Sequence, residues 1–490
     1  MKILMVTSEA TPFAKSGGLG DAVSALSAAL ARLGHDVRVL LPRYYFIDRK
    51  TLESLDKPLV IPETEVRATL YRSFIPGSTA ETYFLDCERY FGRDGIYGSK
   101  AEPDYPDNPA RFSFLCRAAF ALCGYLGWTP DVFHAHDWPS SIVPALLGRA
   151  RKEGKLARSA SVLSIHNLGY QGVYPKESFA SLGLPWEEYH GAGFEFYGKV
   201  NLLQAGLRSA DCLTTVSPTY AREIQTPHFG FGLDGLLRHR SADLVGILNG
   251  VDLDEWNPET DLRIAARYSA EKMAGKAECK AALQKAFGLA VSPEKPLVGM
   301  VGRLTDQKGV GELFGPQYGS AFRICVDMDV QLAIVGTGDR WCEDELRSLS
   351  GKLTNLKAKV GFDENLAHAV EAGSDFFLMP SRYEPCGLNQ MYSLRYGTLP
   401  IVHRTGGLAD TVENYNQDTG TGTGFMFDDL TPRAIYDTVG WTVWAWYNRR
   451  EHIDQMRIRA MGRRFSWEQS AREYEKLYGR ALARAAIEGS

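Results

Sequence analysis

Short apolar runs that favour β-strands recur along the chain, and each one ends in small or polar residues that lead into a helical pattern. The first run covers residues 3–7, and a loop with three glycines follows it. Apolar residues at helical spacing from Val23 to Leu33 then precede a second apolar run over 37–41. This order of elements is typical of a β-α-β unit, in which a helix joins two parallel strands.

The same alternation continues to the end of the chain and predicts an α/β fold class. Further strands are predicted over 132–134, 161–165, 212–216, 297–301, 331–335, 376–379 and 399–402. The segment 16–21 (Ser-Gly-Gly-Leu-Gly-Asp) is similar to 405–410 (Thr-Gly-Gly-Leu-Ala-Asp), which suggests two α/β halves built on one plan. A turn-rich stretch without periodicity, 249–258, is the predicted boundary between these halves.

Composition and charge narrow the class of protein. The chain has 490 residues, 44% of them hydrophobic and 23% charged, which is ordinary for a globular protein of a few domains. A net charge of −4 argues against nucleic-acid binding, and we expect the charged segment 270–285 to form a solvated helix. The first apolar run is too short for a signal peptide, and no run of about 18 apolar residues could span a membrane. The eight cysteines are scattered and form no Cys-x-x-Cys, so we expect a cytoplasmic enzyme without structural zinc.

Polar clusters that follow predicted strands are the candidate ligand sites, because ligands bind beyond the carboxyl ends of parallel strands. The first cluster is the loop from Lys15 to Asp21. Its glycines allow close approach of the backbone, while the following helix N-terminus and the Lys15 ammonium favour an anion. Lys15 precedes the glycines, so this is not the usual phosphate loop. A tight turn with a surface lysine is the alternative, and spacing alone does not separate the two.

The second cluster combines histidines with an acid. It contains His134, His136 and Asp137 after one strand and His166 after the next. These side chains suit zinc or iron, so a metal-dependent hydrolase is one hypothesis. Strand alternation weakens it, because His134 and His136 project to one face and Asp137 to the other. Packing of one histidine in the core is the alternative, and Asp137 and His166 remain candidates for a polar substrate site.

The third cluster is a pair of cations in one loop. Arg303 and Lys308 lie beside Gly302 and Gly309, after a predicted strand. An arginine fork and a lysine point charge could together hold a diphosphate. A merely solvated loop is the alternative.

The fourth cluster is the segment 380–388, which joins a strand to a predicted helix over 389–396. Glu384 precedes Pro385, and a proline fits the first turn of a helix. Such a turn would leave main-chain N–H groups available to a ligand, namely those of Cys386, Gly387 and Leu388. Glu384 could instead be a simple capping acid, and Cys386 is more readily explained as a buried structural cysteine.

Together these motifs resemble those of the bacterial glycogen synthases and the related plant starch synthases. The shared motifs are Lys-x-Gly-Gly-Leu at 15–19, His-x-His-Asp-Trp at 134–138, Arg-Leu-Thr-x-Gln-Lys-Gly at 303–309, Glu-Pro-Cys-Gly-Leu at 384–388 and Thr-Gly-Gly-Leu-Ala-Asp-Thr-Val at 405–412. They occur in the same order and span nearly the whole chain. Each motif alone has modest specificity for the family, but the whole set is highly specific.

The resemblance implies a fold and a reaction. The fold would be two Rossmann-like domains that face a deep cleft, the GT-B arrangement. An acceptor-side domain over 1–248 would be joined by the C-terminal helix 465–490, and 249–464 would bind the nucleotide sugar. The family transfers glucose from ADP-glucose to the non-reducing end of an α-1,4-glucan such as glycogen, with retention of configuration. The resemblance implies no metal, no cofactor, and no nucleic-acid or membrane partner.

The resemblance also implies roles for single residues. Glu384, Asp137 and His166 would serve catalysis. The nucleotide sugar would be bound by Lys15, Gly18, Asp21, Asn249, Arg303, Lys308, Phe362, Cys386, Gly387, Leu388 and Asn389, with the Phe362 ring against the adenine. Asn389 replaces the usual threonine of the family, and the glycines and Pro316 in 311–329 predict a break in a helix that the family usually keeps whole. Two other classes stay open: the metal-dependent hydrolase on the histidine cluster, and a non-catalytic glucan-binding protein.

Overall fold

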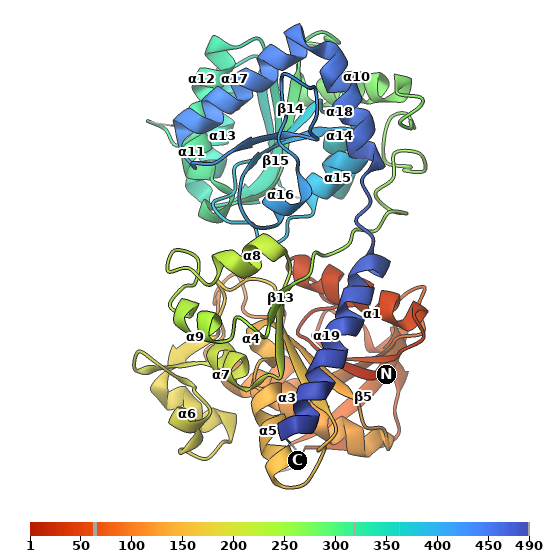
Figure 1. The fold of residues 1–490 in the computed structure, drawn as a ribbon, viewed down its shortest axis with the longest axis vertical. Coiled ribbons are helices and arrows are strands. Elements are labelled where there is room, and N and C mark those ends of the chain that lie inside the picture. Colours follow the sequence, from red (N-terminus) through yellow and green to blue (C-terminus); the bar gives the residue numbers. More distant parts are fainter. Residues whose placement is uncertain (62–65, 318, 362, 489–490) are drawn as a thin grey trace. The chain divides into compact units, whose positions relative to one another are not determined.

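The structure is a computed structural model that describes residues 1–61, 66–317, 319–361 and 363–488 (Figure 1). Residue 488 is described without its side chain. The chain forms two compact units. The first unit consists of Met1–Gly250 together with Trp467–Ser490, and the second consists of Val251–Ser466. Within each unit the strands lie in the interior and helices pack around them (Figure 1).

The first unit is built on a mostly parallel sheet with the strand order β13-β12-β8-β7-β1-β2-β6-β5-β3. Its parallel strands are β1 (Lys2–Val6), β2 (Asp36–Pro42), β6 (Glu81–Asp86), β7 (Val132–His136), β8 (Ala160–Ile165), β12 (Cys212–Thr215) and β13 (Leu244–Gly246). Three antiparallel strands extend it, β5 (Arg67–Phe74), β3 (Glu53–Ser54) and β4 (Leu59–Val60). A small separate sheet contains β9 (Val173–Pro175), β10 (Glu195–Phe196) and β11 (Lys199–Asn201).

The helices of the first unit include one from the far end of the chain. The α-helices are α1 (Gly18–Arg32), α2 (Glu88–Phe91), α3 (Asn108–Leu126), α4 (Asp137–Ser140), α5 (Val143–Lys152), α6 (Glu188–Gly191), α7 (Leu202–Ser209), α8 (Pro218–Glu223), α9 (Asp234–His239) and α19 (Trp467–Glu488), and the 3-10 helices are η1 (Arg49–Thr51) and η2 (Lys176–Leu182). Helix α19 packs against α1 and β8 (Figure 1). Its Tyr478 hydroxyl lies 2.9 Å from Nδ1 of His134, so the C-terminal helix completes the core of this unit.

The second unit is built on a fully parallel sheet with the strand order β16-β15-β14-β17-β18-β19. Its strands are β14 (Leu297–Leu304), β15 (Gln331–Gly338), β16 (Leu356–Val360), β17 (Phe376–Met379), β18 (Leu399–His403) and β19 (Phe425–Phe427). Its helices are α10 (Ala274–Phe287), η3 (Asp306–Lys308), α11 (Val310–Phe314), α12 (Ser320–Asp327), α13 (Arg340–Lys352), α14 (Glu364–Gly373), α15 (Asn389–Arg395), α16 (Gly406–Thr411), α17 (Pro432–Asn448) and α18 (Arg450–Gly462).

The sheet of the second unit is covered on both faces. Val298 and Leu332 belong to one buried apolar cluster, while their neighbours Leu297 and Ala333 belong to another. Strands that are buried on both faces are apolar at every position, which is why they appear in the sequence as short continuous apolar runs. The strands predicted from such runs are all present.

The helix predicted over 270–285 is present as α10. The expectation that its charged side chains face solvent is wrong for two lysines. Lys276 and Lys280 are 4% and 5% exposed. Lys276 donates hydrogen bonds to the carbonyls of Ala372 and Tyr396, at the carboxyl ends of α14 and α15. Burial lowers the pKa of Lys276 to about 7. An amphiphilic lysine stem can be buried where carbonyls or a carboxylate meet its ammonium, and sequence does not reveal such partners.

A buried acid accounts for the second lysine. Asp375, which precedes β17, forms ion pairs of 2.7 Å with Lys280 and 2.6 Å with Arg457, and it also accepts the Leu297 amide. The three charged side chains are all buried. Because one carboxylate serves two cations and a main-chain donor, it ties α10, α18 and β14 to the start of β17.

The predicted interruption within 311–329 is also present. Helix α11 ends at Phe314 and α12 begins at Ser320. A Cβ on Gly315 would stand 2.5 Å from the Gly311 carbonyl oxygen, so the turn after α11 requires a glycine there. Among the described residues, no helix is both long enough and apolar enough to cross a bilayer.

Candidate active site

The glycine loop of the first unit is held by a buried acid that sequence reasoning did not select. Glu9 lies just after β1 and is 2% exposed. Its carboxylate accepts hydrogen bonds from the Ser16 amide at 2.6 Å, from the Ser16 hydroxyl at 2.7 Å and from the Tyr97 hydroxyl at 2.6 Å. In the sequence, Glu9 is a lone acid between an apolar strand and a glycine loop, and this pattern could have identified it as a candidate.

Lys15 and Asp21 form an ion pair at the start of α1. Lys15 Nζ lies 2.6 Å from Asp21 Oδ2, and the Thr11 hydroxyl donates to Asp21 Oδ1 at 2.8 Å. The Lys15 side chain is 52% exposed, so its charge remains accessible to a ligand. A Cβ on Gly18 would meet no atom within 4 Å. Packing within the protein therefore does not require this glycine, and the N-terminal backbone of α1 stays open to solvent.

Asp137 and His166 come together at the ends of the adjacent strands β7 and β8. Asp137 Oδ1 accepts the His166 amide at 2.6 Å and the Asn167 amide at 3.4 Å. Asp137 itself adopts a positive φ of 55°. Burial raises the pKa of Asp137 to about 7, against the opposing effect of these two amides. The carboxyl group therefore holds its proton to a higher pH than an exposed aspartate does.

The histidines of this cluster are neutral and largely engaged with one another. The ring centroids of His134 and His136 are 4.1 Å apart, so they do lie on one face as predicted. His136 Nδ1 lies 3.1 Å from His166 Nε2. Burial lowers the pKa of His134 to about 3 and that of His166 to about 4.

This geometry does not support the metal-dependent hydrolase. Both ring nitrogens of His134 are used inside the protein, by the Tyr478 hydroxyl and by the Ser164 hydroxyl at 2.7 Å. His134 is therefore a core histidine, as the alternative held. Within the part of the chain that the structure describes, the side chains grouped tightly enough to hold a metal ion lie in the second unit and include none of these residues.

In the second unit, Lys308 meets the candidate catalytic acid. Lys308 Nζ lies 2.5 Å from Glu384 Oε2, and the Ser381 hydroxyl donates to the same oxygen at 2.9 Å. Glu384 is 6% exposed. The structure thus unites two residues that lie 76 positions apart in the chain and that sequence reasoning placed in different clusters.

Two glycine loops hold the backbone around Glu384. A Cβ on Gly309 would stand 1.9 Å from the Pro380 carbonyl oxygen, and a Cβ on Gly406 would stand 1.9 Å from the Glu384 carbonyl oxygen. Both glycines have a positive φ, 69° and 44°. Only glycine allows this approach of two backbones. The loop over 405–407 therefore supports the acid, whereas the similar loop at 16–18 leaves a helix end open.

The predicted position of Pro385 in a helix is wrong. Helix α15 begins at Asn389, as predicted for the helix over 389–396, but 384–388 form an irregular loop before it. Gly387 turns this loop with a φ of 72°, and Gln390 Nε2 donates to the Gly387 carbonyl at 2.9 Å. The amides of Cys386, Gly387 and Leu388 thus precede the helix rather than form its first turn.

The other predicted site residues are placed as follows. Arg303 is exposed at the end of β14 and donates to Gln307 Oε1 at 3.3 Å. Asn389 Nδ2 donates to the Val301 carbonyl at 2.8 Å, so this amide nitrogen is engaged by the protein. Cys386 is buried, as expected. Asn249 is 8% exposed near the end of the first segment of the first unit, and Phe362 lies outside the described residues.

Two α/β units, each with polar and cationic groups at the carboxyl ends of its parallel strands, define a glycosyltransferase of the GT-B class. Residues 2–239 match the family described as "Starch synthase catalytic domain", and 284–452 match "Glycosyl transferases group 1". The chain belongs to the family of glycogen and starch synthases and is a glucosyltransferase, as the motifs predicted. Neither a hydrolase nor a non-catalytic protein fits that membership.

Known relatives cover the chain almost completely. It is 54% identical to the glycogen synthase of Treponema denticola over 99% of both chains. It is 47% identical to glycogen synthase 1 of Geobacter metallireducens, over 98% of this chain and 96% of that one. The solved catalytic domain of starch synthase IV from Arabidopsis thaliana, bound to ADP and acarbose, is 30% identical with a TM-score of 0.87, over 98% of this chain and 99% of that one.

Proposed function

We propose that this glucosyltransferase uses ADP-glucose to extend α-1,4-glucan chains at their non-reducing ends, with retention of configuration. The observation that carries the proposal is the contact between Lys308 and the buried Glu384, with Arg303 at the end of β14, five residues before Lys308. The solved starch synthase IV was bound to ADP, which supports the choice of donor.

Cations offset the charge that develops when the donor breaks. As the bond between glucose and ADP lengthens, negative charge grows on the diphosphate. Arg303 and Lys308 stabilise this leaving group, and Lys15 adds a third positive charge. Lys308 then shares its ammonium group between Glu384 and phosphate. Glu384 in turn fixes the position of that ammonium and lies near the electron-poor sugar carbon.

The configuration at the anomeric carbon is retained if the acceptor attacks that carbon on the face from which the diphosphate departs. The acceptor 4-hydroxyl oxygen forms the new bond to the anomeric carbon while the bond from that carbon to ADP breaks. The hydroxyl proton passes to an oxygen of the departing phosphate, so no separate protein base is needed. A metal ion is not needed either, because the three cations supply the positive charge.

The residues of the first unit orient the glucose. Asp137 accepts or donates a hydrogen bond to a sugar hydroxyl, and the neutral His166 ring contributes a second polar contact. Polar main-chain and side-chain groups make the remaining contacts to the nucleotide sugar, and we assign these contacts to Gly18, Asp21, Asn249, Cys386, Gly387, Leu388 and Asn389. We assign stacking on the adenine to Phe362. A cytoplasmic location remains our prediction from the sequence.

A donor comparison tests the proposal. The purified enzyme is assayed with ADP-glucose and with UDP-glucose on a glycogen primer, and nucleotide release is measured together with chain extension. We expect ADP-glucose to give the higher kcat/KM, and the new linkages to be cleaved by an enzyme specific for α-1,4 bonds. A preference for UDP-glucose, or nucleotide release without chain extension, would contradict the proposal.

A further inference from the structure

A fully buried histidine of the second unit has one ring nitrogen without a hydrogen bond. His368 in α14 is 0% exposed, and its Nδ1 lies 2.8 Å from Asp261 Oδ2. Asp261 also accepts the Tyr396 hydroxyl at 2.6 Å and the Arg263 amide at 2.8 Å. An aspartate that accepts from two other donors receives the hydrogen of Nδ1 as well. This tautomer leaves a lone pair on Nε2, and Nε2 has no partner.

Aromatic stacking fixes the direction of that lone pair. The Trp256 ring stacks on His368 with centroids 3.7 Å apart and an angle of 14°. Tyr392 stacks on Trp256 in turn, at 3.9 Å and 6°. With the Asp261 contact on one edge and the indole on its face, the imidazole cannot rotate to find another acceptor or donor. Leaving a buried polar atom unsatisfied costs free energy, so this nitrogen requires an explanation.

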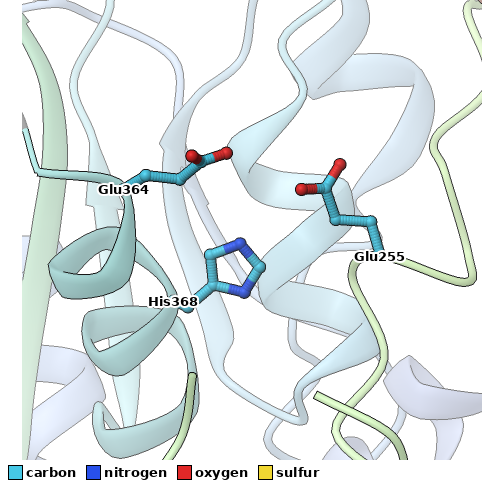
Figure 2. A group of neighbouring side chains, drawn as sticks. All are labelled: Glu255, Glu364 and His368. Carbon is cyan, nitrogen blue, oxygen red and sulfur yellow. The ribbon is translucent and has the colours of Figure 1, made fainter. Parts of the chain in front are cut away.

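Two exposed carboxylates face this nitrogen. Figure 2 shows one ring nitrogen of His368 pointing toward the gap between Glu255 and Glu364. One ligand atom from each of the three side chains lies within 4.8 Å of the other two. Glu364 is one helical turn before His368 on α14, which places both on the same face. Glu255 comes from the segment that enters the second unit after Gly250.

We propose that Glu255, Glu364 and His368 bind a divalent transition-metal ion of the zinc class. The imidazole Nε2 and two carboxylate oxygens supply three ligands, and water completes a tetrahedron. Ligand atoms around zinc lie roughly 3.4 Å apart, which rotation of two solvent-exposed glutamates can reach. Imidazole disfavours calcium and magnesium, which prefer oxygen ligands alone. Asp261 has the role of the outer carboxylate that orients a metal-bound histidine.

The ion in this site would be structural rather than catalytic. None of its three ligands is among the residues proposed to act on the donor or the glucan. By joining Glu255 to α14, it fixes the first residues of the second unit to a helix of that unit. Arg263 competes for the same glutamate, since its guanidinium lies 3.3 Å from Glu255 Oε1. Binding of the metal therefore displaces a weak, partly exposed ion pair.

Metal binding by the full-length enzyme tests the proposal. Metal-free protein is titrated with Zn²⁺ by calorimetry and with Co²⁺ by visible absorption, where a tetrahedral site gives intense bands. We expect one ion per chain and a rise in Tm. Glu364→Gln and Glu255→Gln should each weaken binding by at least about tenfold, as loss of even an orienting partner does in metal sites. Arg263→Gln should strengthen binding, because it removes the competing cation.

Glu259→Gln is the matched control. Glu259 is an exposed acid of the same segment that pairs with Arg395 instead, and its loss should leave the affinity unchanged. Because both ligand variants change exposed side chains, they should fold normally. Absence of saturable Zn²⁺ binding would overturn the proposal. Binding that the two ligand variants do not weaken would overturn it too, since the ion would then occupy another place.

Discussion

The main-chain amide of Gly407 donates a hydrogen bond of 3.0 Å to the carbonyl oxygen of Glu384. The neighbouring Gly406 packs against the same carbonyl. The loop over 405–407 therefore sets the position of the candidate catalytic acid through its backbone.

Gly406→Ala should reduce activity by displacing Glu384. The new Cβ would stand 1.9 Å from the Glu384 carbonyl oxygen, at a φ that alanine disfavours. We expect the free energy of unfolding to fall by about 1–3 kcal/mol. We expect kcat to be affected more strongly than stability, because the substitution displaces Glu384. Gly351→Ala in α13 is the control, because its Cβ would meet no atom. It should leave kcat unchanged and, as a glycine-to-alanine change in a helix, raise stability by up to about 1 kcal/mol. Full activity of Gly406→Ala would show that the acid tolerates movement.

Glu384→Ala should lose nearly all turnover while the fold survives. The buried carboxylate positions Lys308 and faces the reacting sugar in our proposal. Glu384→Gln keeps a hydrogen-bond acceptor for Ser381 but removes the charge, and we expect its kcat to fall about a hundredfold or more. Circular dichroism and steady-state kinetics measure the two effects. A variant that keeps most of its kcat would reduce Glu384 to a structural residue.

Activity should not depend on a divalent metal ion. Lys15, Arg303 and Lys308 offset the charge of the diphosphate in our proposal. Treatment with EDTA should therefore leave kcat unchanged, although it lowers Tm if the site at Glu255, Glu364 and His368 held an ion. Activity that EDTA abolishes and only a divalent ion restores would contradict this mechanism.

Asp137 should make stability fall as pH rises. Burial raises the pKa of its carboxyl from 3.8 to about 7. Between these two values the unfolded chain has released the proton and the folded chain still holds it, so folding is progressively disfavoured up to about pH 7. Relative to the wild type, Asp137→Asn should gain stability from pH 4 to 7, by a few kcal/mol. His134 and His166 make stability rise with pH below pH 6.5, which is the opposite trend. Because both proteins contain these histidines, the difference between wild type and variant cancels their contribution. Denaturant unfolding at each pH measures the difference, and a constant difference would show that Asp137 ionises normally.

Asp375→Asn should destabilise the second unit. The substitution leaves Lys280 and Arg457 buried without their common counter-charge. Removing one partner of a buried ion pair typically costs about 3–5 kcal/mol. Asp428→Asn, which removes an exposed partner of Arg404, should cost less than about 1 kcal/mol. Equal unfolding midpoints for the two variants would contradict the importance of this buried cluster.

Most of the parallel strands could be predicted, because each of these is a short apolar run that stops at a glycine or a polar residue. The parallel strands β6, β13, β16 and β19 and the antiparallel β5 were not predicted. Charged residues interrupt the apolar residues of β5 and β16, and β13 and β19 are only three residues long. The motifs also predicted which segments carry the polar groups of the candidate site. They did not predict which of these side chains touch, as Lys308 and Glu384 do.

The errors at the candidate site have a common physical cause. The two glycine loops look alike in sequence, yet their difference lies in what a Cβ would meet, which only the folded chain defines. The same holds for Glu9 and Lys276, whose partners come from distant segments. Pro385 lies four residues before the helix, because Gly387 turns the chain between them with a positive φ, and sequence does not reveal that turn.

The hydrogen bond between His134 and Tyr478 has a consequence for the order in which the chain folds during synthesis. The ribosome makes the strands of the first unit before the second unit, but their core lacks α19 until residues 467–488 have been added. The second unit is continuous over 251–466 and is complete before then. The first unit therefore finishes folding after the second, and until then Nδ1 of His134 lacks its contact with the Tyr478 hydroxyl.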